Sequence, residues 1–304
     1  MQATSYVMMI RPTRFGPNPQ TIEQEALDVA ALGLEEIHRQ ALKEFDGLLN
    51  LLRVHDVNVL VFEDVKEDPS PDALFPSDWV SFHSNGNAVL YPLEAPNRRK
   101  ERRKDILEAL KKQFVLRNII DLTHHETKGR FLEGTGSMAL DRTQKVAYAC
   151  LSACTHPQVL NNFGSLLQYR TVTFQAVDAH KKPIRHTDSI MSIGTKYVIF
   201  CMDAITLDFD RDVLRQEFKK SKKDIIEVSH EQVDSYCCNV LEVVNNTGIH
   251  YLVMSSRAYQ ALSEDQKEHL ERYAKILHTP LDTIEQYGKG SVRSMLTEIH
   301  LPTI

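Results

Sequence analysis

The sequence lacks a long hydrophobic run, and its start carries no export signal. No stretch approaches the roughly 18 consecutive apolar residues of a membrane-spanning helix. The first residues, Met1 to Met9, have neither the basic start nor the apolar length of a signal peptide. We therefore expect a cytoplasmic protein that makes no membrane contact.

Cysteine is scarce and arranged in no metal-binding or disulfide pattern. The five residues are odd in number and contain no C-x-x-C pair; they are Cys150, Cys154, Cys201, Cys237 and Cys238. This excludes a disulfide framework, and the histidines and cysteines never reach the ligand spacing of a zinc site. We expect buried free thiols, no metal and no cofactor.

Positive charge is not in excess either. The formal net charge is −5, from 36 Lys plus Arg against 41 Asp plus Glu, whereas nonspecific polyanion binders are basic. The one dense basic run, Arg98 to Lys104, is interrupted by Glu101, and we interpret it as the solvated start of a helix. The sequence also lacks a Walker loop and a G-x-G-x-x-G fingerprint, so neither nucleic acid nor a nucleotide is an expected partner.

Strand and helix patterns alternate along the 304 residues. Helical spacing of apolar residues is clearest from Ile22 to Arg53 and recurs at 104–116, 158–169, 211–219 and 264–276. Short apolar runs rich in β-branched residues predict buried strands at 57–62, 88–93, 145–151, 171–177, 196–202, 239–244 and 251–255. The alternation predicts an α/β protein, and the absence of a clear linker predicts a single domain over residues 1–304.

Four short segments concentrate acids, histidine and turn-forming glycines beside predicted strand ends. They are FPSDWVSFH (75–83), FLEGTG (131–136), HTDS (186–189) and GKGSVRSM (288–295). Loops at strand ends commonly present functional side chains, although each segment alone is also compatible with an ordinary turn.

Two acids, a histidine and two arginines in or near these segments are candidate site residues. Glu133 lies between an apolar pair and a Gly-Thr-Gly turn, which suits either a carboxylate held at the rim of the core or a helix-cap acid. His186 and Asp188 would share one face of an extended strand, about 7 Å apart, although a lone His-x-Asp taken by itself favours a structural role. Arg142 and Arg293 would hold a substrate carboxylate by bidentate pairing, or form structural ion pairs.

In this order, the four segments resemble the guanidine-modifying, or pentein, superfamily of arginine deiminases, dimethylarginine hydrolases and glycine amidinotransferases. The likeness is strongest to the branch of amidinotransferases and citrulline-utilisation hydrolases, and it extends from Val7–Pro12 to Gly288–Met295. The resemblance implies five ββαβ units around a pseudo-fivefold axis, with the active site in the central channel. It implies a linear guanidino or ureido substrate such as arginine or citrulline; a homo-oligomer is compatible with it.

The resemblance also assigns roles. Asp78, Glu133 and Asp188 match the acids that bind the planar guanidinium or ureido group, and His186 matches the general acid and base. Carboxylates suit such a group because its N–H donors fit them in a fork. The family nucleophile is a cysteine, whereas this chain has Ser294 at that position. A serine hydroxyl needs a strong base in direct contact, so we expect very low activity.

Several explanations of Ser294 stay open. An engineered Cys-to-Ser variant is favoured because the acids and the histidine are all in place, and a natural noncatalytic binding protein is the alternative. None of the five cysteines lies in a segment expected to replace the missing thiol. A serine hydrolase using Ser294, His186 and an acid is disfavoured because Arg293-Ser294-Met295 is not a G-x-S-x-G elbow.

Overall fold

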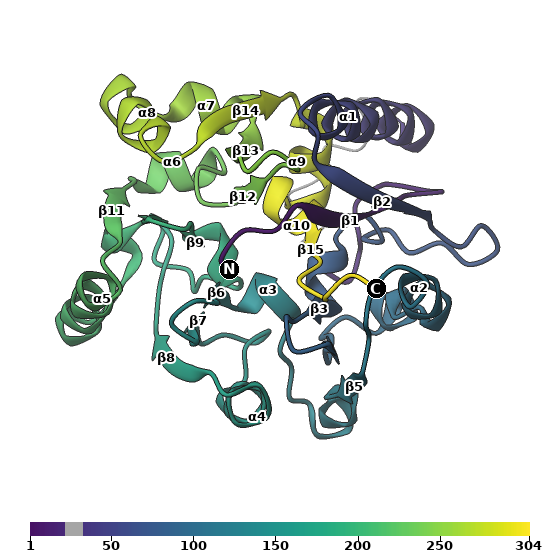
Figure 1. Cartoon of the computed structure of the whole chain (residues 1–304), viewed down its shortest axis with the longest axis horizontal. Coiled ribbons are helices and arrows are strands. Elements are labelled where there is room, and N and C mark those ends of the chain that lie inside the picture. The colour runs from purple at the N-terminus through teal and green to yellow at the C-terminus, as the bar shows by residue number, and fades with distance from the viewer. Residues whose placement is uncertain (22–32) are drawn as a thin grey trace.

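The computed structural model describes residues 1–21 and 33–304, which form five three-stranded sheets arranged in a ring (Figure 1). Sheet by sheet in hydrogen-bonding order, the strands are β15 (Thr297–Glu298), β1 (Tyr6–Arg11) and β2 (Asn58–Glu63); β3 (Val80–Phe82), β4 (Asn87–Leu90) and β5 (Asn118–Asp121); β6 (Ala139–Asp141), β7 (Val146–Cys150) and β8 (Arg170–Phe174); β11 (Asp224–Glu227), β10 (Tyr197–Phe200) and β9 (Met191–Ile193); and β12 (Leu241–Val244), β13 (His250–Ser255) and β14 (Lys275–Thr279).

Every sheet has the same topology. One pair of strands is antiparallel, the middle strand pairs in parallel with the third, and at least one helix lies in the parallel connection. The crossover helices are α1 (Leu34–Val54), α2 (Lys104–Leu110), α4 (Pro157–Leu167), α5 (Asp208–Lys220), and α7 (Ser256–Ala261) with α8 (Glu264–Glu271). Strand β15, near the C-terminus, pairs antiparallel with β1, which closes the ring. The α/β class and the five ββαβ units expected from the resemblance are thereby confirmed.

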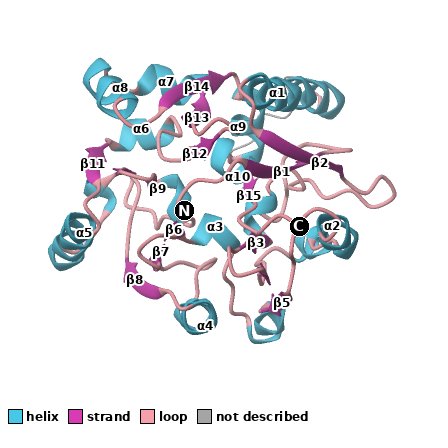
Figure 2. Cartoon of the chain, viewed as in Figure 1, coloured by secondary structure: helices cyan, strands magenta, loops and turns pink. Residues whose placement is uncertain are grey.

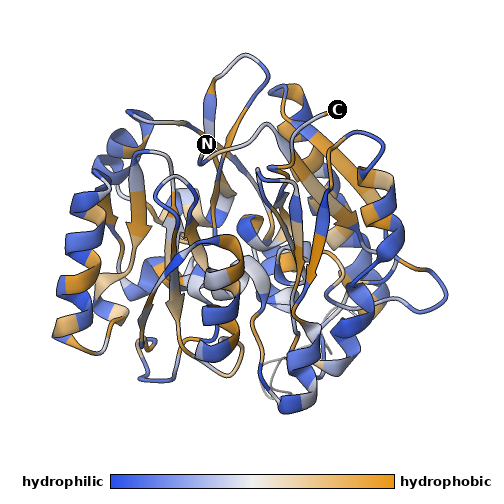
Figure 3. Ribbon diagram, turned by 60° about the horizontal axis from the view of Figure 1, so that its bottom comes forward, coloured by the Kyte–Doolittle hydropathy of each residue, from blue (hydrophilic) through white to orange (hydrophobic). Residues whose placement is uncertain are grey.

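The crossover helices lie outside the sheets, at the periphery of the ring (Figure 2). In α1, the buried residues Ile37, Ala41, Phe45, Leu48 and Leu52 recur every three or four positions and so form one apolar face. The hydropathy of the residues agrees with this arrangement. The strands are mostly hydrophobic, whereas the helices carry both hydrophobic and hydrophilic residues (Figure 3). Helix α8 begins at a capping box of Ser263 and Gln266.

All seven predicted strands exist, with shifted ends. Strands β2 and β8 are partly exposed instead of buried, because each is the outer strand of its sheet and pairs on one side only. The helix predicted to reach Ile276 ends at Glu271, because β14 begins at Lys275. Of the helix predicted from Ile22, residues 22–32 lie outside the described part of the chain.

Short helical turns fill the centre of the ring. They are η3 (Pro76–Asp78), α3 (Gly134–Ser137), η6 (Thr187–Ser189) and α10 (Val292–Met295), and α3 contacts both η3 and η6 while α10 contacts η3. The remaining helical elements are η4 (Pro96–Glu101), η5 (Thr123–Lys128), η7 (Met202–Ala204), α6 (His230–Asp234) and α9 (Asp282–Gly288). Within the described ranges, no helix combines the length and the apolarity needed to cross a membrane.

Candidate active site

A cavity of about 980 Å³, its open mouth included, lies among these central turns. Five of the seven side chains predicted from the sequence line it: Asp78, Glu133, His186, Asp188 and Ser294. Further lining residues include Asp72, Phe75, Arg98, Arg185, Asn239 and Lys289. The four segments identified in the sequence therefore do meet at one place.

The fivefold repeat explains why they meet. Asp78 precedes β3, Glu133 and α3 precede β6, Asp188 precedes β9, and Ser294 precedes β15. Each segment therefore occupies the same place in its unit, directly before the first strand. In the remaining unit that place, directly before β12, belongs to Asn239. Asn239 was not among the predicted site residues, because it falls in a predicted strand. Alignment of the five units on their first strands would have indicated it.

Glu133 and His186 form a pair in which the carboxylate is buried and the imidazole is partly exposed. His186 Nε2 lies 2.6 Å from Glu133 Oε2, and the other carboxylate oxygen accepts a hydrogen bond from the backbone N–H of Glu94 at 2.9 Å. Burial opposes the charge of Glu133, but the hydrogen bond and the charge of His186 outweigh it and lower the pKa of Glu133 to about 2. For His186, burial is likewise outweighed by the hydrogen bonds of Cys154 and Glu133, so its pKa lies well above 6.5. The pair is charged at neutral pH.

Ser294 is held by Asp188 and Asn239. Its hydroxyl donates to Asp188 Oδ2 at 3.2 Å, and Asn239 Nδ2 donates both to Ser294 Oγ at 3.1 Å and to Asp188 Oδ2 at 3.0 Å. Asn239 Oδ1 accepts from the backbone N–H of Ser291 at 3.1 Å. Burial raises the pKa of Asp188 to about 6, although the charge of His186 opposes the rise. Among the described residues, no hydrogen bond joins Ser294 to His186.

Arg98 lies inside the site, which corrects the interpretation of its basic run as a solvated helix start. Its guanidinium donates to Asp78 Oδ2 at 2.9 Å and to Glu101 Oε2 at 3.0 Å, and it lies 3.5 Å from Asp72. Arg98 and Glu101 are buried because the run folds into η4, which turns both side chains inward. Burial raises the pKa of Glu101 to about 7, against the opposing charge of Arg98.

Glycine is required where segments from different units touch. A Cβ on Gly136 would lie 2.4 Å from Asp78 Oδ1, and a Cβ on Gly290 would lie 2.7 Å from the ring of Phe75. The predicted close approach of the C-terminal glycines is therefore made against Phe75, whose ring forms part of the cavity wall.

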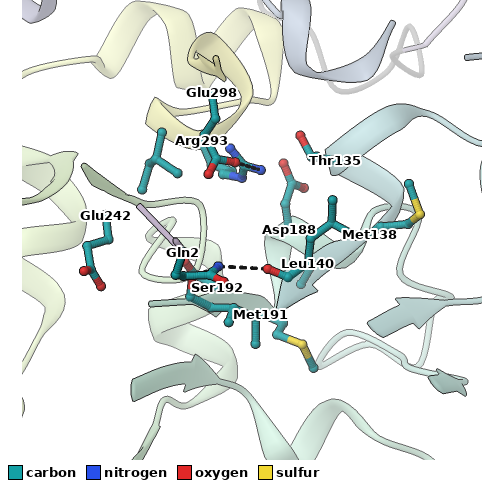
Figure 4. Close-up of a pocket in the computed structure, with 13 residues that line it drawn as sticks. Gln2, Thr135, Met138, Leu140, Asp188, Met191, Ser192, Glu242, Arg293 and Glu298 are labelled. Carbon is teal, nitrogen blue, oxygen red and sulfur yellow. Dashed lines mark hydrogen bonds and ion pairs between the residues drawn. The ribbon is translucent and has the colours of Figure 1, made fainter. Parts of the chain in front are cut away.

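Two details of the predicted site are corrected. His186 and Asp188 do not share a strand face, because Thr187–Ser189 form the helical turn η6. Arg142 and Arg293 do not line the cavity: Arg142 Nη2 lies 3.3 Å and Arg293 Nη2 lies 2.9 Å from Glu298 Oε2. Arg293 and Glu298 face an adjoining cavity of about 370 Å³, which shares Asp188 with the first (Figure 4). The structure thus favours the alternative of structural ion pairs.

The cations that do line the cavity are Arg98, Arg185 and Lys289. Arg185, about half exposed, pairs with Glu94, and Lys289 lies between the two C-terminal glycines in the left-handed conformation. The cavity therefore combines buried carboxylates and the buried Arg98 with two exposed cations, Arg185 and Lys289. This arrangement suits a ligand with a planar cationic or ureido end and an anionic end.

Cys154 adjoins the site, which the sequence did not indicate. Its sulfur and the nearest ligand atoms of Glu133 and His186 all lie within 4.8 Å of one another, and Arg185 Nη2 lies 2.9 Å from the sulfur. Burial raises the pKa of the Cys154 thiol to about 12, and the residue is fully buried. This trio is the type of ligand set that binds zinc, but the adjacent guanidinium opposes a cation there. The expectation of no metal stays a prediction.

Solved structures share this fold over 98% of the chain. The N-terminal domain of ArgZ, an arginine dihydrolase from cyanobacteria crystallised with its substrate, is 17% identical, with a TM-score of 0.74 and 98% of its own chain covered. AgrE in complex with L-arginine is 16% identical, with a TM-score of 0.76, and 40% of its longer chain is covered. A dimethylarginine dimethylaminohydrolase adduct is 16% identical, with a TM-score of 0.64 and full coverage of that chain. These likenesses establish the pentein fold.

No curated protein matches the sequence. A family model does match, over residues 11–301, and so covers nearly the whole chain. With the fivefold architecture and the central cavity in agreement, this chain belongs to the family described as N,N dimethylarginine dimethylhydrolase, eukaryotic.

Proposed function

We propose that this chain is a pentein hydrolase scaffold for C–N bond cleavage in a linear guanidino compound, with activity strongly reduced by Ser294. The observation that carries the proposal is the convergence of Asp78, Glu133, His186 and Asp188 with residue 294 around one cavity. Membership of the dimethylarginine hydrolase family and the substrate-bound arginine dihydrolase fold support the same class of reaction.

The carboxylates are suited to hold the substrate. Asp188 and Asp78 are buried acceptors on the cavity wall, and a guanidinium donates N–H groups in the plane that contains its central carbon. Docked between them, this carbon faces residue 294, because Asp188 contacts both the substrate site and Ser294 Oγ. Holding the carbon next to the attacking atom is the positioning component of catalysis.

His186 is suited to move the protons. Its raised pKa keeps it protonated at neutral pH, so it is ready to donate a proton to the ammonia or amine that leaves. In a chain with cysteine at position 294, the thiolate sulfur would bond to the guanidino carbon and the C–N bond would break. The now neutral imidazole would then take a proton from water, which attacks that carbon and releases the thiolate. Glu133 keeps the ring oriented throughout.

Ser294 lacks the base that such a mechanism requires. Its hydroxyl donates to Asp188, whereas His186 is bound to Glu133 and already carries its proton. These contacts also argue against a serine hydrolase built on Ser294 and His186. We expect turnover at least about a thousandfold below that of a cysteine enzyme.

The finer expectations form part of the same proposal. Arg185 and Lys289 favour a substrate with a carboxylate, such as arginine or citrulline, and replace Arg142 and Arg293 in that role. Water is the proposed acceptor, and an amine would make the chain an amidinotransferase. The proposal treats residues 1–304 as one cytoplasmic domain that uses no cofactor, metal, nucleic acid or membrane, and a homo-oligomer is compatible with it.

A noncatalytic ligand-binding protein is the second candidate. It is favoured by one observation, the satisfied hydrogen bonds of Ser294 with Asp188 and Asn239, which make serine a stable member of the site. Release of ammonia from arginine, citrulline and agmatine, and of methylamine or dimethylamine from methylated arginines, separates the two candidates when the chain is compared with its Ser294→Cys variant. Turnover of one compound by the variant alone supports the enzyme. Binding without turnover by either form supports the binding protein.

A further inference from the structure

A third and smaller cavity of about 250 Å³, its mouth included, shares no lining residue with the candidate active site. Its polar walls come from distant parts of the chain and include His83, Ser84, Arg142, Lys145, Tyr169 and His300. Only one of these residues, Arg142, was a candidate for substrate binding, and it does not line the candidate active site. The proposed reaction gives no role to the others.

The charge around this cavity is predominantly positive. Glu298 is the acid that contacts its wall, and it is already bound to Arg142, to Arg293 and, at 3.0 Å, to His300. Among the described residues, no carboxylate lies within ion-pair distance of Lys145, whose Nζ lies 4.5 Å from the centroid of the Tyr169 ring. Glu298 is therefore shared between two guanidinium groups, and the Lys145 ammonium has no carboxylate partner among the described residues.

Two buried nitrogen atoms of the wall have no hydrogen-bond partner among the described residues. They are His83 Nδ1 and Arg142 Nε. If Ser81 donates to His83 Nε2, from which it lies 2.9 Å, the free Nδ1 carries the hydrogen and is a donor. Buried donors without an acceptor are costly to the folded state, so each is a place where a bound acceptor would stabilise the protein.

The neighbouring histidines respond to the same positive field. Burial and then Arg142 lower the pKa of His83 well below 6.5, and the same two causes lower that of His300 to about 4. Both rings are therefore neutral at pH 7, and the cavity carries the charges of Arg142 and Lys145. Its size excludes a nucleotide, and its polar walls do not suit an apolar ligand.

We propose that this cavity is a binding site for a small tetrahedral oxyanion, phosphate or sulfate, with Lys145 Nζ, Arg142 Nε and His83 Nδ1 as its donors. A tetrahedral oxyanion presents an oxygen to each of several donors, which a halide cannot do. Two ion pairs link the site to the active-site segment, because Glu298 joins Arg142 to Arg293, the neighbour of Ser294.

Thermal unfolding in inorganic phosphate tests the proposal at constant ionic strength. Phosphate at ten times its Kd should raise Tm by about 2 °C in a saturable manner, and sulfate should compete. The increase should be lost in Lys145→Met and retained in Lys112→Met, an exposed lysine outside the cavity. The second variant controls for the general stabilising effect of these salts, which does not saturate at millimolar concentration.

The candidate active site also holds cations, so Arg185→Gln is the decisive comparison. This variant should keep the phosphate response. Loss of the response in Arg185→Gln but not in Lys145→Met would assign phosphate to the substrate cavity and overturn the proposal. If Lys145→Met does not fold, ³¹P NMR of the unmodified chain is sufficient: saturable broadening that agmatine does not displace supports the site, and its absence refutes it.

Discussion

His186 Nε2 lies 2.6 Å from Glu133 Oε2, and this contact fixes both the charge and the direction of the ring. The carboxylate holds the imidazole in its protonated form, so His186 is an acid at neutral pH instead of a base for Ser294. This explains how Asp78, Glu133, His186 and Asp188 can surround the cavity while the Ser294 hydroxyl has no base to activate it. A thiol at position 294 would be different, because a nearby imidazolium favours the thiolate.

Glu133→Gln tests this pair. The substitution should lower the pKa of His186 towards or below 6.5, because burial then acts with less opposition, and NMR titration of the histidine ring measures the shift. The folded-state pKa of Glu133, about 2, lies below its ordinary 4.5, so its contribution to stability is complete above pH 4.5 and lost as the pH falls through 2.

The folded-state pKa of His186 lies well above its ordinary 6.5. The stability that the pair contributes is therefore complete below pH 6.5 and is lost as the pH rises through the raised pKa. Glu133→Gln should therefore cost about 3 kcal/mol of unfolding free energy between pH 4.5 and 6.5, and less outside this window. Urea unfolding at several pH values measures the difference. A His186 pKa unchanged by the substitution would contradict the account.

Asn239 is predicted to position Ser294 and Asp188. Asn239→Ala removes the donor shared by both and the acceptor for the Ser291 N–H, so it should cost about 2 kcal/mol and weaken ligand binding. Thermal unfolding and calorimetric titration measure the two effects. Asn246→Ala is the matched control, because its hydrogen bonds are exposed, and its effect should stay below about 0.5 kcal/mol. Equal effects of the two substitutions would remove the special role of Asn239.

Thiol labelling separates position 294 from the native cysteines. All five are buried, and burial raises the pKa of the Cys154 thiol to about 12, so iodoacetamide should leave the folded chain unlabelled. Ser294→Cys should gain one adduct, and ligand should protect it, because residue 294 lines the cavity. Intact-mass spectrometry counts the adducts, with Ser294→Ala as the unlabelled control. Rapid labelling of Cys154 would show that the site is more open than described.

Substitution of Arg185 should affect ligand binding, whereas substitution of Arg142 should affect stability. Arg185→Gln should weaken binding of a carboxylate-bearing ligand such as arginine about tenfold and leave agmatine, which has no carboxylate, unchanged. Arg142→Met should instead lower the unfolding free energy by about 2 kcal/mol, because Glu298 loses one of its buried partners. Titration with both ligands and urea unfolding distinguish these effects. Selective loss of arginine binding in Arg142→Met would restore its assignment as a carboxylate ligand.

The sequence predicts the α/β class and seven strands correctly, because each of these strands overlaps a run of at least five mostly apolar residues. It does not predict the other eight strands, which are β1, β3, β5, β6, β9, β11, β14 and β15. Six of them have four residues or fewer, and β5 is also largely exposed, so they show little hydrophobic pattern, while β14 begins where a helix was predicted to continue. The fivefold repeat is invisible for the same reason, since each unit conserves its topology and not its residues. The ring itself was expected from the family resemblance alone.

The site was predictable where its residues stand in glycine-bounded turns, as Glu133 does. The place of Arg98 in the site was not predictable, because a basic run does not indicate that one guanidinium turns inward to contact Asp78 and Glu101. The position of Cys154 beside the site was not predictable either, because its proximity to His186 depends on how two units pack. Arg142 and Arg293 were misplaced because charge alone does not distinguish a substrate carboxylate from Glu298.

The most direct measurement is acid-quenched mass spectrometry of Ser294→Cys after mixing with excess arginine. The account predicts a covalent adduct on the peptide that contains position 294, retaining the guanidino carbon, with at least one ammonia released for each adduct. The same treatment of the unmodified chain should give no adduct. A folded Ser294→Cys variant that binds arginine yet forms no adduct and releases no ammonia would contradict the assignment of this cavity as a guanidino hydrolase site.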